Sequence, residues 1–322
     1  MKFWVGVTDK SWFDFLASRL SIDEVNFWQP SGDTSFKAIQ PWEFFLFKLH
    51  SPLNFIVGGG VFVKYSKLPL SIAWETFQEK NGAGDFQSFR ERIVHYQQNN
   101  NRHFIPDPFI GCIVLTNPFF FHEKDWIPVP ENWSSNIVRG KSYNTEDSIG
   151  STLWEKVSER IKGINPVQES GIYNHEVVEP RYGGEYLAHQ RLGQGGFRVV
   201  VIEAYNKKCA ITGERTLPVL ESAHIKPYAK SGPHNIKNGL LLRSDLHKLF
   251  DLGYMTITTD FHVEVSKLIK EEYQNGHEYY ALHGKKLLSC IFRQHSAGDS
   301  DLIRHPIPDI RQVIPEHSAP PR

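Results

Sequence analysis

Residue types suited to phosphodiester hydrolysis occur close together in the C-terminal half of the chain. His224 is followed by Asn238, His247 and Asp251 at intervals of fourteen, nine and four residues. Hydrolysis requires an activated water, a metal ion that bears charge on the phosphate, and help for the leaving oxygen. Histidine suits proton transfer because its unperturbed pKa lies near neutrality. A histidine and an aspartate four residues apart on a helix point from one face and can share a metal ion.

Each of these residues also has an ordinary interpretation. His224 alone fits a hydrogen-bonded loop residue, and Asn238-Gly239 alone fits a hairpin turn. His247 with Asp251 alone fits a surface pair. Their order and their sequence context decide between these interpretations, because joint matches in an expected context outweigh single ones.

The flanking sequence extends the pattern. It reads Cys209-Ala-Ile-Thr-Gly213, Leu220-Glu-Ser-Ala-His-Ile-Lys-Pro227, Asn238-Gly-Leu-Leu-Leu242 and Asp245-Leu-His-Lys-Leu-Phe-Asp251, after an upstream Arg191-Leu-Gly-Gln-Gly-Gly-Phe-Arg198. This stretch resembles the HNH nuclease family over roughly residues 191–257. The resemblance implies a β-hairpin packed against a helix (the ββα-metal fold) and double-stranded DNA as the substrate.

The resemblance also implies a role for each residue of the constellation. His224 would end the first strand as the general base, and Asn238 would brace the loop and orient that base. His247 matches the metal-ligand position, and Asp251 is a candidate second ligand. The expected ion is Mg²⁺ or Mn²⁺, although an imidazole ligand also accepts Ni²⁺, Co²⁺ or Zn²⁺.

Two positions depart from the family pattern. Ala223 stands where many HNH nucleases place an aspartate or histidine ligand directly before the base. Asp251, Glu221 or water are the open alternatives for that missing ligand. Many relatives also carry four cysteines that bind structural zinc, whereas only Cys209 occurs around this hairpin, which argues against structural zinc. We expect Cys209 to pack as a small hydrophobic residue.

The N-terminal half carries a second resemblance. Its segments Phe3-Trp-Val-Gly-Val7, Phe27-Trp-Gln-Pro30, Ile39-Gln-Pro-Trp-Glu-Phe-Phe-Leu-Phe-Lys48 and Ile56-Val-Gly-Gly-Gly-Val-Phe-Val63 are similar to a PUA-like β-barrel of the EVE type. The similarity covers about residues 1–155. It implies a nucleic-acid reader, and beside an HNH nuclease we expect it to recognise a modified base that is flipped out of the duplex.

A flipped base needs aromatic faces and polar groups that read its edge. Trp28, Trp133 and Tyr143 lie in segments expected outside the strands, and Ser31, Asp33, Asn132 and Ser142 are polar groups near them. They are the predicted pocket for 5-methylcytosine or 5-hydroxymethylcytosine. The alternative is that the aromatic side chains belong to the barrel core.

The elements that must position these residues follow from periodicity. We predict strands over 3–8, 42–49, 55–65 and 109–116, with glycines 58–60 at a bulge or tight corner. Helices are predicted over 11–20, 72–79, 85–97, 147–161 and 197–205, and a loop over 126–133. The fold class is α+β: a PUA-like β-barrel with flanking helices at 1–160, a linker at 161–190, an HNH domain at 191–295 and a tail at 296–322.

Composition narrows the function classes. Net charge is zero, yet residues 181–248 hold 11 Lys/Arg against 5 Asp/Glu, whereas residues 1–180 hold 17 against 21. The basic excess fits a polyanion partner, with chance segregation as the alternative. Three cysteines without a CxxC pair suggest neither a disulfide framework nor a cysteine-ligated zinc site. With no signal-peptide core and no stretch of membrane-spanning length, we expect a cytoplasmic protein.

These observations favour a modification-dependent restriction endonuclease with an N-terminal reader and a C-terminal HNH nuclease. One alternative is an HNH endonuclease or nickase that acts on unmodified DNA. Another is a DNA-binding regulator whose HNH fold has lost catalysis. One HNH site cuts one strand at a time, so a double-strand break would indicate a homodimer or sequential nicking.

Overall fold

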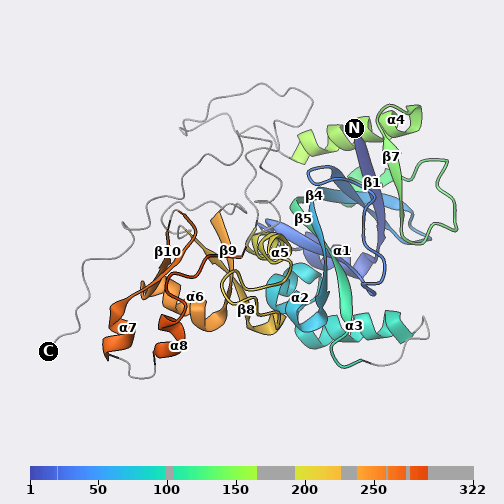
Figure 1. The fold of residues 1–322 in the computed structure, drawn as a ribbon. Coiled ribbons are helices and arrows are strands. Elements are labelled where there is room, and N and C mark those ends of the chain that lie inside the picture. The colour runs from blue at the N-terminus through green and yellow to red at the C-terminus, as the bar shows by residue number, and fades with distance from the viewer. Residues whose placement is uncertain are drawn as a thin grey trace. The chain divides into compact units, whose positions relative to one another are not determined.

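The computed structural model describes residues 1–19, 21–98, 105–164, 193–225, 238–258, 260–272 and 276–288 (Figure 1). The chain divides into two compact units, residues 1–196 and 197–322. Both mix helices and strands, which confirms the α+β class. Residues 165–190 of the predicted linker and the whole predicted tail, 296–322, fall outside the described residues, whereas residues 161–164 of the predicted linker belong to a helix. None of the described helices is long and apolar enough to cross a lipid bilayer.

The first unit is built on one curved sheet of seven strands. The main path runs β2-β5-β4-β3-β1-β7, and β6 pairs with β4. The pair β1–β3 is parallel and the other pairs are antiparallel. Among the described residues no pairing joins β2 to β7, so a closed barrel is not shown. The strands are β1 Lys2–Thr8, β2 Glu24–Gln29, β3 Phe44–Leu49, β4 Phe55–Pro69, β5 Phe109–Phe120, β6 Ile127–Pro128 and β7 Gly140–Asn144.

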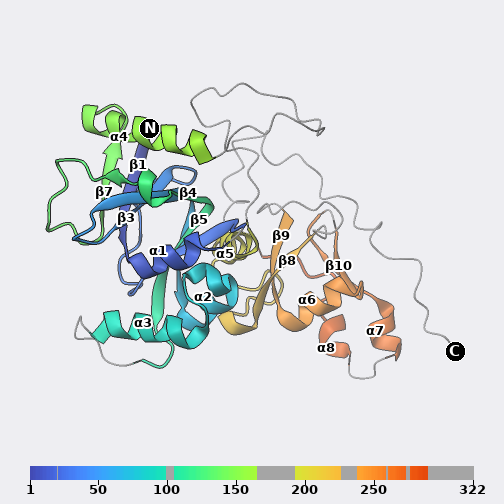
Figure 2. The ribbon, with the colours of Figure 1, turned by 180° about the vertical axis from the view of Figure 1, so that it is seen from behind.

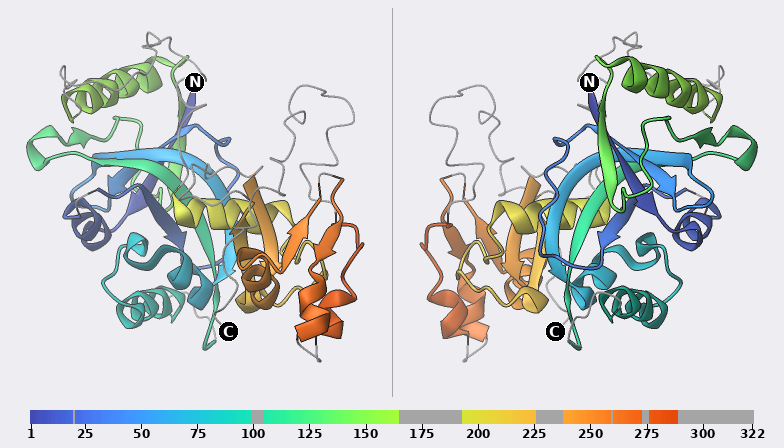
Figure 3. Two further views of the ribbon diagram at one scale, coloured as in Figure 1. Left: turned by 90° about the vertical axis from the view of Figure 1, so that its left-hand side faces the viewer. Right: turned by 90° about the vertical axis from the view of Figure 1, so that its right-hand side faces the viewer.

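The long strand β4 bends because of its glycines (Figure 3). A Cβ atom at Gly58 would lie 2.2 Å from the Phe119 carbonyl oxygen, so only glycine permits this approach of β5. The β4–β5 register shifts between Gly59 and Val61 and again between Phe62 and Lys64. These shifts confirm the predicted bulge, which bends the strand. Both β4 and β5 therefore continue beyond their predicted ends.

Helices cover the sheet from different sides. They are α1 Lys10–Ala17, α2 Leu70–Phe77, α3 Phe86–Gln98 and α4 Ser148–Ile164, with 3₁₀ turns at Gln78–Asn81 and Glu123–Asp125. Figures 1 and 2 show α4 beside β7 and α2 with α3 at the opposite end of the sheet. Phe45 and Phe47 of β3 pack in the core cluster of α1, whereas Leu46 packs in the cluster of α4. This alternation is the two-residue period of a strand.

Strand β2 was not predicted, because Glu24 and Asn26 interrupt its apolar pattern. Both side chains are buried with polar partners: Asn26 Nδ2 donates to Asn81 Oδ1 at 2.9 Å. The Glu24 side chain is 1% exposed, and its carboxylate accepts a hydrogen bond from Lys80 Nζ at 2.9 Å. Its two oxygens also accept the main-chain N–H groups of Gly195 and Gly196 at 2.7 and 2.6 Å, at the start of α5 (Gln194–Ala204). These buried polar residues are therefore stabilised by partners distant in the sequence, and the strand lacks the apolar pattern by which strands are predicted.

The second unit contains the predicted hairpin and helix. Strands β8 Leu220–His224 and β9 Gly239–Arg243 pair antiparallel, and α6 Ser244–Asp251 follows directly. Cys209 is fully buried, as predicted for a small hydrophobic residue. The remaining elements are the 3₁₀ turn Leu217–Val219, strands β10 Met255–Ile257 and β11 Val263–Val265, and helices α7 Lys267–Glu272 and α8 His277–Tyr280.

The buried Glu24 carboxylate gives a stability prediction. Glu24→Ala leaves two helix N–H groups without their acceptor and removes one of the two carboxylates that pair with Lys80, so the free energy of unfolding of the first unit should fall by about 2–4 kcal/mol. Asp23→Asn is the matched control, because Asp23 pairs with the same Lys80 at 2.6 Å but is 56% exposed. Its cost should stay below about 1 kcal/mol in urea titrations of the full chain. Equal losses of stability in the two variants would contradict the proposed role of Glu24 as acceptor for the N–H groups at the start of α5.

Candidate functional site

The hairpin places His224 against helix α5. His224 stacks on Phe197, with ring centroids 4.0 Å apart and planes 9° apart. His224 pairs across the hairpin with Gly239, where an added Cβ would lie 2.3 Å from Val201 Cγ2. Directly opposed residues of a strand pair face the same side. The missing side chain at Gly239 therefore lets α5 approach closely enough to stack under His224.

The opposite face of β8 carries a different group of residues. Ser222 Oγ donates to the Arg198 carbonyl at 3.2 Å, so Ser222 and His224 face α5. Glu221 faces the other way, and its Oε2 lies 2.6 Å from His247 Nδ1 on α6. The Nε2 atom of His247 lies 3.3 Å from Asp251 Oδ2. The structure thus brings Glu221, His247 and Asp251 together and places His224 on the α5 side of the strand.

A surface hollow of about 550 Å³ surrounds His247. It is lined by Glu221, Ser244, Asp245, His247, Lys248, Asp251 and Leu252. His224 and Asn238 are not among the described residues that line it. The Asn238 carbonyl accepts the Ile225 N–H at 2.8 Å and so continues the hairpin ladder. The segment between them, residues 226–237, lies outside the described residues.

The residues around His247 fit a divalent cation with two protein ligands. His247 Nε2 and Asp251 Oδ2 lie 3.3 Å apart, so both would be able to bind one ion. A carboxylate on the other ring nitrogen, here Glu221, commonly orients a metal-binding histidine. The two carboxylates contact opposite edges of the ring. In the part of the chain that the structure describes, no three His, Cys, Asp or Glu side chains gather as a metal-holding group.

The start of α6 is fixed by an ion pair. Arg243 donates two hydrogen bonds of 2.6 Å to the carboxylate of Asp245, and they hold the pKa of Asp245 below its usual value. Tyr279 of α8 donates to the same carboxylate at 3.2 Å. Asp245 lines the hollow, but its oxygens are already engaged by these two donors. We therefore assign it to anchoring the helix that carries His247.

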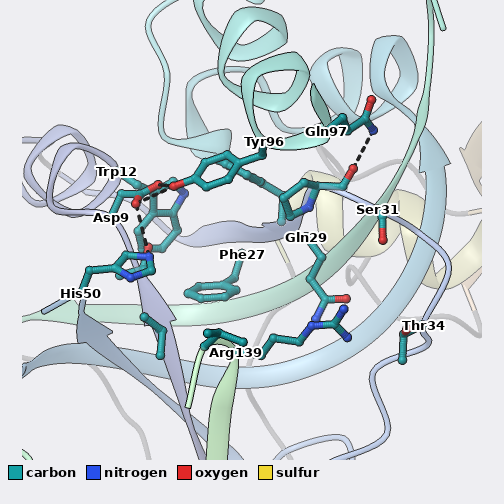
Figure 4. Close-up of a pocket in the computed structure, with 15 residues that line it drawn as sticks. Asp9, Trp12, Phe27, Gln29, Ser31, Thr34, His50, Tyr96, Gln97 and Arg139 are labelled. Atoms are coloured by element: carbon teal, nitrogen blue, oxygen red, sulfur yellow. Dashed lines mark hydrogen bonds and ion pairs between the residues drawn. The ribbon is translucent and has the colours of Figure 1, made fainter. Parts of the chain in front are cut away.

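The first unit contains a larger cavity, of about 690 Å³ (Figure 4). Its aromatic walls include Trp12, Phe27 and Trp28, and Trp28 Nε1 donates to the Asn81 carbonyl at 2.9 Å, which fixes the indole plane. Figure 4 shows Asp9 pointing toward Tyr96 and His50 at one side. The other polar lining residues are Thr8, Gln29, Ser31, Thr34, Gln97 and Arg139. The volume lies in the range of small-ligand sites.

The predicted base-pocket residues divide between two places. Trp28 and Ser31 line the cavity, whereas Asp33 is not among its described lining residues. Tyr143 is 6% exposed, lies in the core cluster beside α4, and stacks on Phe3 at 5.9 Å. Trp133 packs against the same cluster.

Tyr143 also contacts the polar residue predicted beside it. Its hydroxyl donates to Asn132 Oδ1 at 3.0 Å, and burial raises the pKa of Tyr143 to about 12. The expectation that Trp28 and Tyr143 lie outside strands was wrong, because β2 contains Trp28 and β7 contains Tyr143. Ser142 also lies in β7.

Five cavity residues were not predicted from the sequence: Asp9, Trp12, His50, Tyr96 and Arg139. Asp9 and His50 directly follow the parallel-paired strands β1 and β3. Polar residues at such adjacent strand ends could have been grouped from the strand pattern. Tyr96 is 87 residues from Asp9, its hydrogen-bond partner, and no local pattern connects them.

Comparison with known protein families identifies the hairpin region. Residues 209–258 match the family model described as HNH endonuclease, a range that includes β8, β9, α6 and β10. No curated protein matches the chain. The chain therefore contains an HNH endonuclease domain, which supports nuclease activity on DNA.

The contact between Glu221 and His247 gives a testable prediction about metal binding. Glu221→Gln weakens the acceptor that orients the imidazole, so divalent metal affinity should fall about 10–100-fold. Mn²⁺ binding is measured by calorimetry on the full chain. The control is Glu264→Gln, which changes an exposed strand glutamate of the same unit and should leave affinity unchanged. Affinity that is unchanged in Glu221→Gln would contradict an orienting role.

Proposed function

We propose that the chain is a divalent-metal-dependent DNA endonuclease that acts on DNA containing 5-methylcytosine or 5-hydroxymethylcytosine. The observation that carries the nuclease part is the HNH family match over a hairpin and helix that set His247 between Glu221 and Asp251. The observation that carries the reader part is the aromatic-walled cavity of the first unit.

In this proposal His224 is the general base that activates water. Its stacking on Phe197 fixes the ring plane. Asn238 braces the hairpin loop and orients the base. His247 and Asp251 hold the cation, which would stabilise the charge that develops on the phosphate. The basic excess of residues 181–248 supplies sequence-independent phosphate contacts.

The reader proposal rests on the cavity and on the similarity of residues 1–155 to PUA-like domains of the EVE type. A flipped base is held by stacking and read along its edge. The indole of Trp28 provides a fixed aromatic wall, and Ser31 and Gln29 provide polar groups. Arg139 lines the same cavity and forms no ion pair among the described residues, so it is available to a DNA phosphate. Stacking on one base depends less on salt than phosphate contacts do.

One observation favours a second candidate function. His224 faces α5 and is absent from the described lining of the His247 hollow. A DNA-binding regulator without catalysis would tolerate this separation, whereas a nuclease needs both histidines at one phosphate. Cleavage of plasmid DNA distinguishes the two, because the regulator binds without cutting. Cleavage of unmodified plasmid at the same rate would instead support an unspecialised HNH endonuclease or nickase.

The general-base role predicts a large loss of activity. His224→Ala should lower the cleavage rate of methylated or hydroxymethylated plasmid about 10²–10⁴-fold, because no other group then takes the proton from water. Binding to the same DNA, measured without divalent metal, should be retained. Excess chelator should stop wild-type cleavage while the circular dichroism spectrum stays unchanged. Cleavage within a few-fold of wild type in His224→Ala, or in chelator, would remove this mechanism.

The cavity predicts which aromatic side chain carries the preference for modified DNA. Trp28→Ala removes a cavity wall and should reduce the preference for modified over unmodified duplex by about tenfold or more, with metal-dependent nicking at low salt retained. Trp133→Ala is the matched control, because Trp133 packs in the core cluster beside α4 rather than lining the cavity. The preference is measured by fluorescence competition. Loss of preference in Trp133→Ala alone would move the reader site to that cluster.

A further inference from the structure

A reader of 5-methylcytosine must reject thymine, and this inference rests on the reader function proposed above. Thymine carries the same methyl group at C5, so an apolar contact beside C5 cannot separate the two bases. They differ at C4, where cytosine has an amino group that donates hydrogen bonds and thymine has a carbonyl that accepts them. The pocket therefore needs a group that accepts hydrogen bonds and cannot donate them.

Asp9 is the one carboxylate among the described residues that line the cavity. Its backbone is extended (φ −80°, ψ 145°) at the N-cap of α1, yet its side chain makes no capping hydrogen bond. The carboxylate is held instead by the Tyr96 hydroxyl, which lies 2.7 Å from each oxygen. His50 Nε2 lies 3.5 Å from Oδ1 (Figure 4). The Asp9 side chain is 27% exposed, so part of it remains open to a ligand.

The other polar side chains that line the cavity do not combine accepting hydrogen bonds with an inability to donate them. The amide of Gln29 and the hydroxyls of Ser31 and Thr34 can each donate or accept. The guanidinium of Arg139 only donates. Burial, together with the hydrogen bond to Asp9, raises the pKa of Tyr96, so its hydroxyl remains protonated and its proton is committed to Asp9. A carboxylate has about four acceptor sites, so Asp9 can accept further hydrogen bonds beside that of Tyr96.

We propose that Asp9, positioned by Tyr96, accepts a hydrogen bond from the C4 amino group of the extruded base. Asp9 thereby selects 5-substituted cytosine over thymine and other pyrimidines with a C4 carbonyl. A 4-keto base would place its oxygen against the carboxylate, and two acceptors repel each other. The arrangement combines attraction for one base with repulsion of the other, as selective sites commonly do.

The test compares two bases that differ only at the pairing edge. Full-length protein without divalent metal is titrated with duplexes that carry one 5-hydroxymethylcytosine or one 5-hydroxymethyluracil, each opposite its complementary base. Matched duplexes with cytosine or thymine at that position are the references. We expect wild-type protein to bind the hydroxymethylcytosine duplex at least about tenfold more tightly than the hydroxymethyluracil duplex. Asp9→Asn, which replaces one acceptor oxygen with a donor, should reduce this ratio to about threefold or less.

Two further variants define the role of each residue. Tyr96→Phe keeps the ring but releases the carboxylate, so the ratio should fall while the preference for hydroxymethylcytosine over cytosine persists. Asp14→Asn makes the same change at an exposed carboxylate of α1 that pairs with Lys10 and is not among the described lining residues, so it should leave the ratio unchanged. Circular dichroism and thermal unfolding confirm that each variant is folded.

The outcomes separate this inference from the reader function. Tight binding of both hydroxymethylated duplexes, each preferred equally over its reference, overturns the role of Asp9 and leaves the reader function intact. A wild-type ratio retained in a folded Asp9→Asn protein also overturns it. Binding of both modified duplexes no better than their references overturns the reader function and the inference together.

Discussion

The geometry of the nuclease domain depends on the absence of a side chain at Gly239. Phe197 and Val201 of α5 occupy the space where a Cβ would be, 2.3 Å from the nearest atom in the case of Val201. This close contact lets Phe197 stack flat beneath His224. An alanine at 239 would push α5 away from the hairpin and remove the surface that fixes the plane of His224. Glycine at position 239 is therefore explained by its packing against α5 and not only by the turn propensity of the Asn238-Gly239 pair.

The motif-bearing part of the chain could be predicted because its structure is local. Strand, strand and helix follow one another between residues 220 and 251, and only residues 225–238 lie between the two strands in the sequence. Strand β2 could not be predicted, because Glu24 and Asn26 are polar yet buried, and their partners lie 171 and 55 residues away. Trp133 and Tyr143 were predicted as pocket residues because aromaticity alone does not distinguish a core from a cavity.

The cavity of the first unit follows from how the sheet ends. Strands β1 and β3 run parallel, so Asp9 and His50 emerge at the same edge, and α1 begins immediately after Asp9. Tyr96 of α3 reaches this edge and engages the carboxylate that would otherwise cap α1. The side chain of Asp9 is thereby turned toward the cavity, and the helix start relies on its backbone alone. The hydrogen bond from Tyr96 thus takes the place of a capping hydrogen bond within α1, at the edge of the cavity where the proposed ligand would bind.

The environment of His247 has an electrostatic consequence. If Nδ1 donates its proton to Glu221 at 2.6 Å, the lone pair of Nε2 faces Asp251 Oδ2 at 3.3 Å, and two acceptors repel each other. A cation held by His247 and Asp251, as proposed above, would remove that repulsion, and Glu221 would keep the ring oriented through Nδ1. The placement of two carboxylates on opposite ring edges thus supports the proposed cation site.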